Sequence, residues 1–567
     1  MVKIAQCRLS NFMSRHPWFT LFVFGLAVFG LVTRGGFSNS DTPRRLQVTH
    51  WLWTDQPQVA PDQQFAEAHP TAFRLFSPGW CELTGRHGEK FAQFGLGQSL
   101  TMLPADVLSE WVTGKLSRQK TPTTQDGGDL TDQHRKINQV IVNLATFPLI
   151  GAVSLIFSYE LLLLLGFSKK VSLAATMLLV VSTTFIVYMQ DVQENSLIYF
   201  CYVGATMFIL RASRGNLRSN LLLAGALAGY GLLVRLTNVV YLVPLSALSA
   251  YACAVHLGTD ISQVRKAYLL AKNSILFFGT PIFIFFCIDR YYNFYRFGEV
   301  FSTYMKQCAQ FYAQLGGYPP NFPFGYDAVS GFFGPLLSPN YSVFLYDAFL
   351  VFTLSFALLQ NGSLTIRQKA VVWGALSALI GLALAFSGTY FWTGGLDWGP
   401  RHHLVAAELA CLVGLAFFVR DVRTWRPWIR ILAGLNLFVA VAIQLMALPI
   451  RAFIEPLQSD AGDPVGLFLL MRARNILYLA AGRFEQAGLD YGLPAILRRV
   501  TGKEADQLFV FFVADMFSSL SRALISSLWF LLLLLTLWIF VTVVLQGIRN
   551  GKEINSEYKG PVSPTLR

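Results

Sequence analysis

The sequence predicts an all-α polytopic membrane protein, a bundle of about twelve transmembrane helices. Hydrophobic residues make up 54% of the 567 residues and charged residues only 14%, whereas soluble domains carry about 25% charged residues. Apolar runs near the roughly 20 residues that cross a bilayer recur along the chain. These runs lie near 17–33, 137–165, 171–188, 195–211, 219–235, 239–256, 272–289, 341–360, 370–391, 403–419, 430–448 and 524–546.

Basic residues in the short connections predict how the bundle is oriented, because cytoplasmic loops are enriched in Lys and Arg. The N-terminus and alternate connections are basic, at Lys3, Arg8, Arg15, Lys169, Lys170, Arg211, Arg214, Arg218, Arg265, Lys266, Arg367, Lys369, Arg420, Arg423 and Arg426. The intervening connection 189–195 has Asp191 and Glu194 but no Lys or Arg. Both termini are therefore predicted to be cytoplasmic.

The net charge of +13 is largely explained by these short loops. It therefore predicts contact with anionic membrane lipids at the cytoplasmic face and no nucleic-acid partner. The chain has no zinc-type cysteine spacing and no Walker loop.

Three regions are predicted from the loops. Residues 1–448 form a transmembrane catalytic domain, with a polar exoplasmic loop over 34–136 that contains short amphipathic helices and an aromatic exoplasmic loop over 290–340. Residues 449–523 are expected to be exoplasmic despite their arginines, because long loops escape the charge rule. Their apolar runs near 465–480 and 508–516 are too short to cross and are expected at the interface. Residues 524–567 form the last helix and a cytoplasmic tail.

Cysteines and glycines give two further expectations. Only Cys81 and Cys308 fall in exoplasmic loops, so at most one disulfide is possible, and whether the two pair is left open. Gly225 and Gly229 have the GxxxG spacing that permits close helix packing.

An acid, Asp41, follows the first span by a few residues, within Ser40-Asp-Thr-Pro43. This tetrapeptide also predicts the start of a helix, with Asp41 as its cap. Leu46, His50 and Trp53 would then lie on one face of that amphipathic helix. Capping and catalysis are both open for an isolated acid at this place.

Four passages together resemble the GT-C superfamily of integral-membrane glycosyltransferases, in particular the bacterial mannosyltransferase and aminoarabinose-transferase group, also called glycosyltransferase family 39. They are Asp41 itself, Phe91-Ala-Gln-Phe-Gly-Leu-Gly-Gln-Ser-Leu100 with Pro104, Asn293-Phe-Tyr-Arg-Phe-Gly298 leading to Leu337-Ser-Pro339 and Phe344-Leu-Tyr346, and Trp392-Thr-Gly-Gly-Leu-Asp-Trp-Gly-Pro-Arg401. The resemblance implies a GT-C-like bundle, a polyprenyl-phosphate-linked sugar donor and a bacterial-type plasma membrane. Two departures are Asn340-Tyr341 after Ser338-Pro339, where relatives often have Gly-Arg, and His402-His403 after Arg401, where relatives have an aromatic residue.

The chemistry of an exoplasmic site leads to the same donor. Nucleotide sugars are not supplied on that side, so the sugar must arrive on a carrier that crosses the membrane, and a polyprenyl phosphate does so. Its phosphate is a good leaving group, so the enzyme needs a base for the acceptor hydroxyl and positive groups for the phosphate. Asp41 is the predicted base, and a single displacement would invert the anomeric carbon. Asp191, Glu194 and His402 are predicted to position sugar or acceptor, although the two acids also suit a polar turn.

Arginines near the bilayer surface are the candidates for the carrier phosphate, since a charge at that depth needs a function or a partner. Arg235 interrupts a long apolar run, Arg401 begins another, and Lys90 in the first loop is a third candidate. Arg401 could instead be an anchor or pair with Asp397. His402 and His403 are adjacent and do not have metal-ligand spacing. No metal or cofactor is required, and a divalent cation, Mg²⁺ or Mn²⁺, remains open.

The predicted function is an inverting glycosyltransferase that moves a hexosyl or pentosyl group from a polyprenyl-phosphate carrier to an exoplasmic glycolipid, polysaccharide or protein. A lipid-linked saccharide flippase is an alternative, but it should show repeated halves, which the sequence lacks. An O-antigen ligase or polymerase is another, because residues 449–523 would supply its late exoplasmic loop. A structural scaffold is the third.

Overall fold

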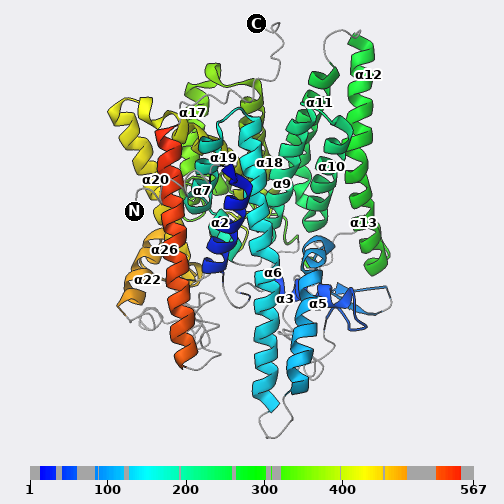
Figure 1. Cartoon of the computed structure of the whole chain (residues 1–567). Coiled ribbons are helices and arrows are strands. Elements are labelled where there is room, and N and C mark those ends of the chain that lie inside the picture. The colour runs from blue at the N-terminus through cyan, green and yellow to red at the C-terminus, as the bar shows by residue number, and fades with distance from the viewer. Residues whose placement is uncertain are drawn as a thin grey trace.

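The computed structural model describes residues 13, 15–33, 37, 41–59, 83–86, 88–119, 127–190, 193–257, 263–301, 308–309, 321–395, 397–450, 452, 454–460, 462–481 and 519–550 (Figure 1). Helices dominate these residues, and the one hairpin in them pairs β1 (Leu83–Thr84) with β2 (Lys90–Phe91). Within this described part of the chain, eight helical segments are long and apolar enough to cross a membrane. The predicted all-α polytopic fold is confirmed.

The eight segments coincide with eight of the predicted spans. They belong to α6 (Gly127–Leu164), α9 (Glu194–Ala212), α10 (Leu217–Val234), α11 (Val239–Leu257), α12 (Gln263–Asn273) with α13 (Thr280–Phe297), α18 (Ile366–Phe386), α20 (Pro427–Ala447) and α26 (Ser519–Arg549). A short π-helical stretch, Ser274–Gly279, joins α12 to α13.

The other four predicted spans are also helical. Residues 17–33 form the 16-residue α2 (Pro17–Val32), and 403–419 form α19 (Leu404–Asp421). Every residue of α19 from Leu404 to Val419 is buried, so this helix is the centre of the bundle. Residues 171–188 form α7 (Lys169–Ser182) and α8 (Phe185–Gln190), and 341–360 form α16 (Val343–Tyr346) and α17 (Phe349–Leu359).

Both interrupted spans break at the same place in the bundle. The backbone N–H of Thr184, between α7 and α8, donates to Asp347 Oδ1 at 2.7 Å, and Asp347 lies between α16 and α17. The Thr184 hydroxyl donates to the Asp347 carboxylate and to Glu408 of α19. Each of these two runs is thus divided into two helices, and a buried carboxylate satisfies a backbone N–H that the break leaves without a helical partner.

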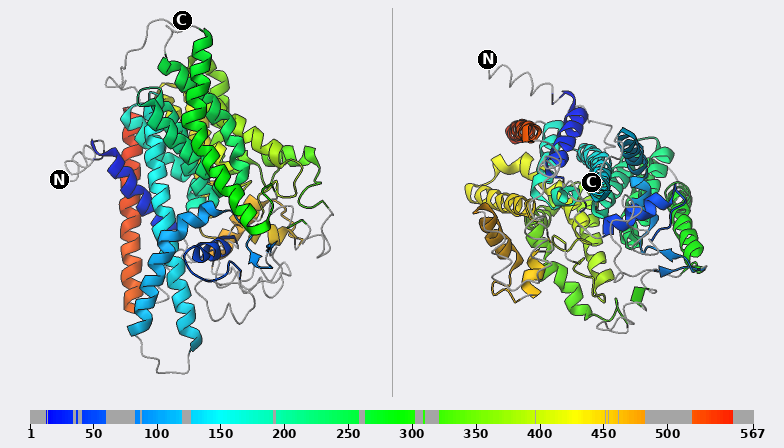
Figure 2. Two further views of the ribbon diagram at one scale, coloured as in Figure 1. Left: turned by 90° about the vertical axis from the view of Figure 1, so that its right-hand side faces the viewer. Right: turned by 90° about the horizontal axis from the view of Figure 1, so that it is seen from below.

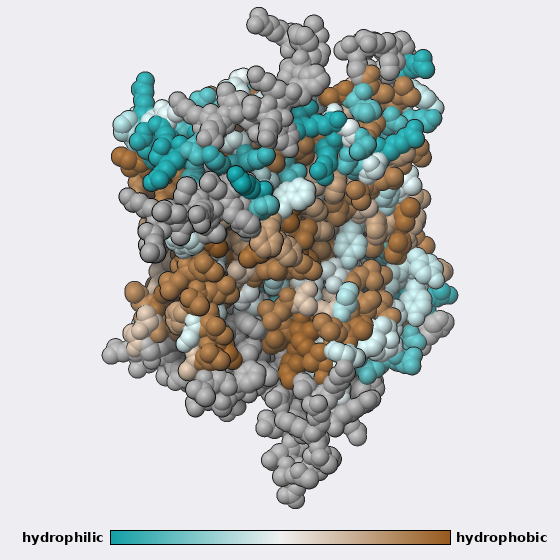
Figure 3. All heavy atoms as spheres, in the orientation of Figure 1, coloured by the Kyte–Doolittle hydropathy of each residue, from teal (hydrophilic) through white to brown (hydrophobic). Residues whose placement is uncertain are grey.

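The basic connections meet at one end of the bundle. Arg214 donates to the Leu164 carbonyl, Gln368 donates to the Leu165 carbonyl, and Gly547 near the end of α26 lies against the carbonyl of Lys170. We call this the basic end; hydrophilic side chains collect over it, above a hydrophobic band (Figure 3, top). The clustering agrees with the charge pattern, while the cytoplasmic assignment of this end stays a prediction.

The opposite end, called here the site end, carries an additional layer. It contains α3 (Asp41–Trp51), the β1–β2 hairpin, α5 (Leu96–Gln119) and the extension of α6 beyond the bundle (Figures 1 and 2). Helices were predicted in this loop, but α5 at 24 residues is longer than the short helices expected.

Buried Arg296 of α13 attaches this layer to the bundle. Its guanidinium donates to the carbonyls of Ala92 and Phe94, and its own carbonyl accepts from the N–H of Arg86. Cys308 packs against Leu83 of the hairpin and is disulfide-bonded. Cys81, the partner that the sequence offers, lies outside the described residues.

Gly225 and Gly229 of α10 pack against α13 and the preceding π-helical stretch. A Cβ added to Gly225 would lie 2.2 Å from the carbonyl oxygen of Phe278, and one added to Gly229 would lie 3.0 Å from the Ile282 Cα. The expected close packing at this GxxxG spacing is confirmed.

The chain after residue 448 also packs on the site end. It forms α21 (Ile454–Asp460) and α22 (Phe468–Ala480), joined by a buried ion pair between Arg472 and Glu455. Asn340 accepts from the N–H of Phe468 and donates to the carbonyl of Gly466. The 465–480 run, expected at the interface, thus contacts the loop after α15 (Ala328–Leu337), and the 508–516 run lies outside the described residues.

Candidate functional site

Four chain segments bring charged side chains together at the site end. They are the first turns of α3 and α9, the break between α10 and α11, and the loop from Asp397 to His402. Glycines allow the chain to turn before and within this loop: Gly394, three residues before it, and Gly399 have φ of 88° and 73°, a region that favours glycine. A side chain at Gly394 would also collide with Arg401.

Asp41 faces Arg401 in the first half of the site. The Arg401 Nη1 lies 3.6 Å from the Asp41 Oδ2 and 2.7 Å from the Asp397 Oδ2. Gln193 donates to the other oxygen of Asp397 at 2.9 Å, and Asn195 donates to the Arg401 carbonyl at 2.7 Å. Asp41 keeps 18% of its side chain exposed, so its carboxylate is held in place but accessible.

Glu194 organises the second half. It is buried at the start of α9, and its two oxygens pair with different arginines, Arg45 at 2.6 Å and Arg235 at shorter range. Arg45 also donates to Gln98 of α5 at 2.6 Å and lies over the Phe94 ring. A carboxylate this deeply buried is stable only when it is paired and hydrogen-bonded, as it is here.

His402 connects the two halves. Its Nδ1 bonds the Arg235 guanidinium, and its ring stacks on Phe386 at 4.3 Å between centroids. Burial, followed by the positive charges of Arg235 and Arg401, holds the pKa of His402 well below its ordinary value. The ring is therefore neutral near pH 7, and Nδ1 accepts the hydrogen bond from Arg235.

Among the residues that the structure describes, the site contains equal numbers of opposite charges. Arg235 bonds the His402 ring, and Arg401 directly precedes His402 in the chain, so both arginines belong to one site. Each currently faces carboxylates, and the set comprises Asp41, Glu194, Asp397, Arg45, Arg235 and Arg401. An incoming phosphate would find two arginines already oriented, which suits bidentate recognition of phosphate oxygens.

Most of the predicted site residues that the structure describes lie together. The structure brings Asp41, Glu194, Arg235, Arg401 and His402 into one network. For Arg401, the predicted Asp397 ion pair forms alongside the contact with Asp41.

Two predicted residues are not placed in this network. Lys90 lies in the hairpin, where it pairs with Thr84, and Asp191 lies outside the described residues. Asn340, at the departure from the family pattern, binds the C-terminal segment as described above.

Sequence reasoning missed Arg45 and Gln98. Arg45 follows Asp41 by four residues, and this spacing puts both on one side of a helix. That spacing, read together with the predicted helix start at Asp41, could have identified Arg45. Nothing in the sequence indicates that Gln98 would meet it.

Metal binding is not indicated by the described side chains. No three His, Cys, Asp or Glu residues among them are arranged to hold a metal ion. A divalent cation bound with the help of Asp41 and Asp191 would depend partly on Asp191, which lies outside the described residues, so the cation stays a prediction.

Residues 138–285 match the model of a protein family described as dolichyl-phosphate-mannose-protein mannosyltransferase. The matched segment includes Glu194 and Arg235 but not Asp41 or Arg401. The resemblance to GT-C membrane glycosyltransferases is confirmed. No curated protein shows significant sequence similarity to the chain.

Three solved structures show remote similarity, all of an oligosaccharyltransferase from Archaeoglobus fulgidus. The complex of AglB with an inhibitory peptide and a dolichol-phosphate has 12% identity and a TM-score of 0.40, over 76% of this chain and 56% of the archaeal one. The apo form has 11% identity and a TM-score of 0.40, over 80% of this chain and 59% of the archaeal one. The chain thus spans little more than half of these proteins. TM-scores below 0.5 do not establish a common fold. The likeness to known proteins therefore rests on the family match.

Proposed function

We propose that this protein is an inverting glycosyltransferase that moves a sugar from a polyprenyl-phosphate carrier to an acceptor hydroxyl at the site end of the membrane. The observation that carries the proposal is the contact between Asp41 and Arg401. It puts a carboxylate that can accept a proton beside a guanidinium that can bind a phosphate, and these are the two groups that the reaction needs.

The reaction forms one bond and breaks one. The acceptor oxygen attacks the anomeric carbon, and the bond from that carbon to the phosphate oxygen breaks with its electron pair. The acceptor proton passes to the Asp41 carboxylate, and the carrier leaves as polyprenyl phosphate. A second catalytic acid is unnecessary because phosphate, unlike a sugar alkoxide, leaves without protonation.

Arg401 and Arg235 bind the carrier phosphate in this proposal. Charge that develops on the leaving oxygen is stabilised by donors already in position, and the surrounding burial strengthens that attraction. The networks around Asp397 and Glu194 hold the two guanidiniums when no donor is bound. Arg45 acts through Glu194 and is a positioning residue.

The donor class is supported by the family match, because that family is named for a dolichyl-phosphate-linked mannose. A bacterial-type plasma membrane with both termini in the cytoplasm, and hence an exoplasmic site, is part of the proposal. The orientation is supported by the basic connections, which gather at the end opposite the site.

The test is sugar transfer in membranes that contain the protein. Radiolabelled sugars on polyprenyl phosphate are supplied as a small panel to wild type, Asp41→Asn and Asp55→Asn at matched expression. Asp55 is an exposed acid just beyond α3 and serves as the control. We expect transfer or donor hydrolysis in wild type and Asp55→Asn, and a loss of at least about a hundredfold in Asp41→Asn.

Equal turnover in all three proteins would remove Asp41 from the mechanism. Movement of intact lipid-linked sugar across the membrane without cleavage, unaffected by Asp41→Asn, would instead identify a flippase.

A further inference from the structure

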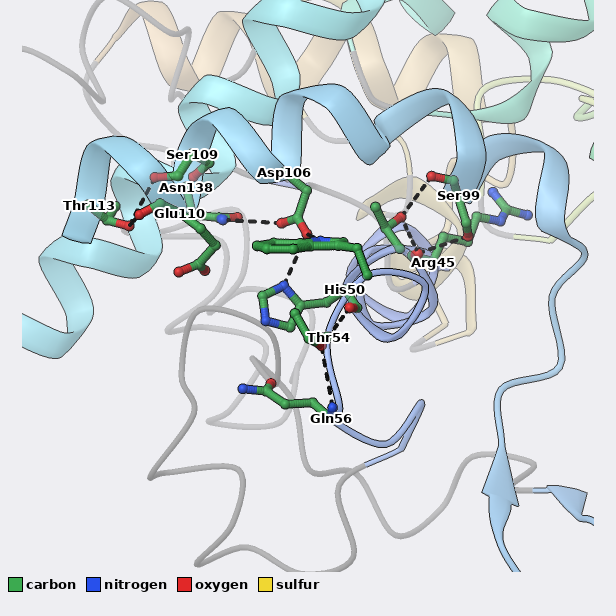
Figure 4. Close-up of polar contacts among 12 residues, drawn as sticks. Arg45, His50, Thr54, Gln56, Ser99, Asp106, Ser109, Glu110, Thr113 and Asn138 are labelled. Atoms are coloured by element: carbon green, nitrogen blue, oxygen red, sulfur yellow. Dashed lines mark hydrogen bonds and ion pairs between the residues drawn. The ribbon is translucent and has the colours of Figure 1, made fainter. Parts of the chain in front are cut away.

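A second polar cluster lies in the layer at the site end, apart from the Asp41 network. His50 Nδ1 is 3.0 Å from the Asp106 Oδ2 (Figure 4). The Trp53 indole N–H donates to the same oxygen at 2.8 Å. Asn138 of α6 contacts the other oxygen of Asp106 at 3.5 Å. Asp106 and Asn138 are each only 1% exposed, so helices α3, α5 and α6 meet at a buried polar centre.

Several oxygens in this cluster have no hydrogen-bond partner within the described part of the chain. They are Gln56 Oε1, Ser109 Oγ, Glu110 Oε1 and Asn138 Oδ1. Ser109 is fully buried, whereas Gln56 and Glu110 are partly exposed, so the cluster extends from the interior to the surface. A buried polar atom without a partner destabilises the folded chain, so four in one cluster call for an explanation.

The unpartnered atoms define the chemistry of what could satisfy them. Three are carbonyl or carboxylate oxygens that can only accept, and the fourth is a hydroxyl. An occupant must therefore donate hydrogen bonds. Asp106 and Glu110 would repel a phosphate, and the described acids and histidines here are not arranged to hold a metal ion.

Trp53 adds an apolar wall to this cluster. Its ring meets His50 edge to face, and 39% of the residue is exposed. An indole face beside amide and carboxylate acceptors fits a sugar, whose hydroxyls donate and whose C–H face packs on aromatic rings.

The cluster is also placed to serve the reaction. Asp106 follows Gln98, the partner of Arg45, by eight residues on α5. The two positions are therefore about 12 Å apart along the helix. This separation suits a ligand that reaches the Asp41 site with one end and extends beyond it with the other.

We propose that the cluster is a saccharide-binding subsite for the acceptor, so that the acceptor is a glycan. The inference rests on the proposed function and names its acceptor class. The subsite is formed by His50, Trp53, Gln56, Asp106, Glu110 and Asn138.

The test measures binding of fluorescently labelled oligosaccharides to the purified full-length protein in nanodiscs. The probes are oligomers of mannose, glucose and N-acetylglucosamine of two to six units, with a lysine-rich peptide as comparison. The variants are Trp53→Ala and Glu110→Ala, and the second removes a carboxylate that has no partner among the described residues. Trp111→Ala is the control, since that side chain is 59% exposed on a neighbouring position of α5. Unfolding temperatures are measured for all.

We expect one oligosaccharide class to bind wild type and Trp111→Ala equally, and about tenfold more weakly to each cluster variant, with longer oligomers binding more tightly. The inference is overturned if no oligosaccharide binds, if the cluster variants bind as wild type does, or if the peptide binds in preference.

Donor turnover by the wild type separates this inference from the proposed function. Release of polyprenyl phosphate without saccharide binding would refute the subsite and leave the transferase standing. Saccharide binding that depends on the cluster, with no turnover of any donor, would refute the transferase and leave the subsite.

Discussion

Glu194 illustrates how the site keeps arginines near the membrane ready for a ligand. Its two carboxylate oxygens form ion pairs with Arg45 and Arg235, and Glu194 is only 3% exposed. Removing one partner of a buried ion pair leaves an uncompensated charge, which costs about 3–5 kcal/mol. A donor phosphate that binds Arg235 therefore competes with a carboxylate already in place, and this competition favours ligands with at least two negative oxygens.

Loss of one phosphate-binding arginine should weaken use of the donor. We expect Arg235→Gln and Arg401→Gln to lower kcat/KM for the polyprenyl-phosphate donor about a hundredfold each, because each removes a charged donor from the leaving group. Steady-state kinetics in detergent measure this effect. Arg423→Gln, at an exposed position of the basic end, is the matched control and should leave kcat/KM unchanged. A similar loss in the control would show a general effect of removing positive charge.

The depressed pKa of His402 predicts how stability changes with pH. As pH falls below about 6.5, the unfolded chain takes up a proton that folded His402 does not, so stability is lost with acidification. For one proton the slope approaches about 1.4 kcal/mol per pH unit. Unfolding temperatures of wild type and His402→Gln between pH 7.5 and 5 isolate this contribution. Parallel curves for the two proteins would contradict it.

Two of the membrane-spanning runs are each divided into two helices, and the two breaks meet in the bundle. Thr184 donates from a helix break to Asp347 at a second break, beside Glu408 of the central α19. Hydropathy averaged over a span-length window recognises both runs as membrane helices but cannot detect a break of two residues. The acid that satisfies the broken backbone comes from a distant part of the sequence, so it becomes visible only in three dimensions.

The contact of α10 with the π-helical stretch before α13 gives a packing prediction. Gly225→Leu should destabilise the protein by about 3 kcal/mol, because its Cβ would collide with the Phe278 carbonyl, which is backbone and cannot move aside. Thermal unfolding in detergent is the measurement. Gly434→Leu on α20 is the control, since no atom apart from the nearby backbone of its own helix lies within 4 Å of the position of its Cβ, and its effect should stay within about 0.5 kcal/mol. Equal stability of both variants would mean that α10 does not approach the π-helical stretch closely.

For the whole molecule, a disulfide supports the layer at the site end. Cys308 is the bonded cysteine among the described residues, whereas Cys201, Cys253, Cys287 and Cys411 are free. We expect Cys308→Ser to cost about 2–5 kcal/mol, because the bond restricts the unfolded state. Alkylation and mass spectrometry with and without reductant should show one disulfide in wild type. Cys287→Ser is the control and should retain the bond. If reduction leaves the alkylation pattern of the wild type unchanged, Cys308 does not form a disulfide.

The whole fold was largely predictable because the membrane requires it. All twelve apolar runs expected as spans are helical where the structure describes them, and charge in the short loops predicted which ends lie together. Asp41, Glu194, Arg235 and Arg401 were also recognisable, since charged residues near the bilayer are rarely without a function or a partner. The pairings were not recognisable. Gln98 meets Arg45 only because α3 and α5 pack side by side, and no local pattern encodes that contact.

Asp41 and Arg401 together should transfer a lipid-linked sugar with inversion, and the products of a single reaction can decide this. Purified protein in nanodiscs is given a polyprenyl-phosphate sugar, and both the released polyprenyl phosphate and the anomeric configuration of the transferred sugar are determined for wild type and Asp41→Asn. The proposal predicts equimolar release and transfer with inversion in wild type, and neither in the variant. Retained configuration, or release that survives Asp41→Asn, would contradict it.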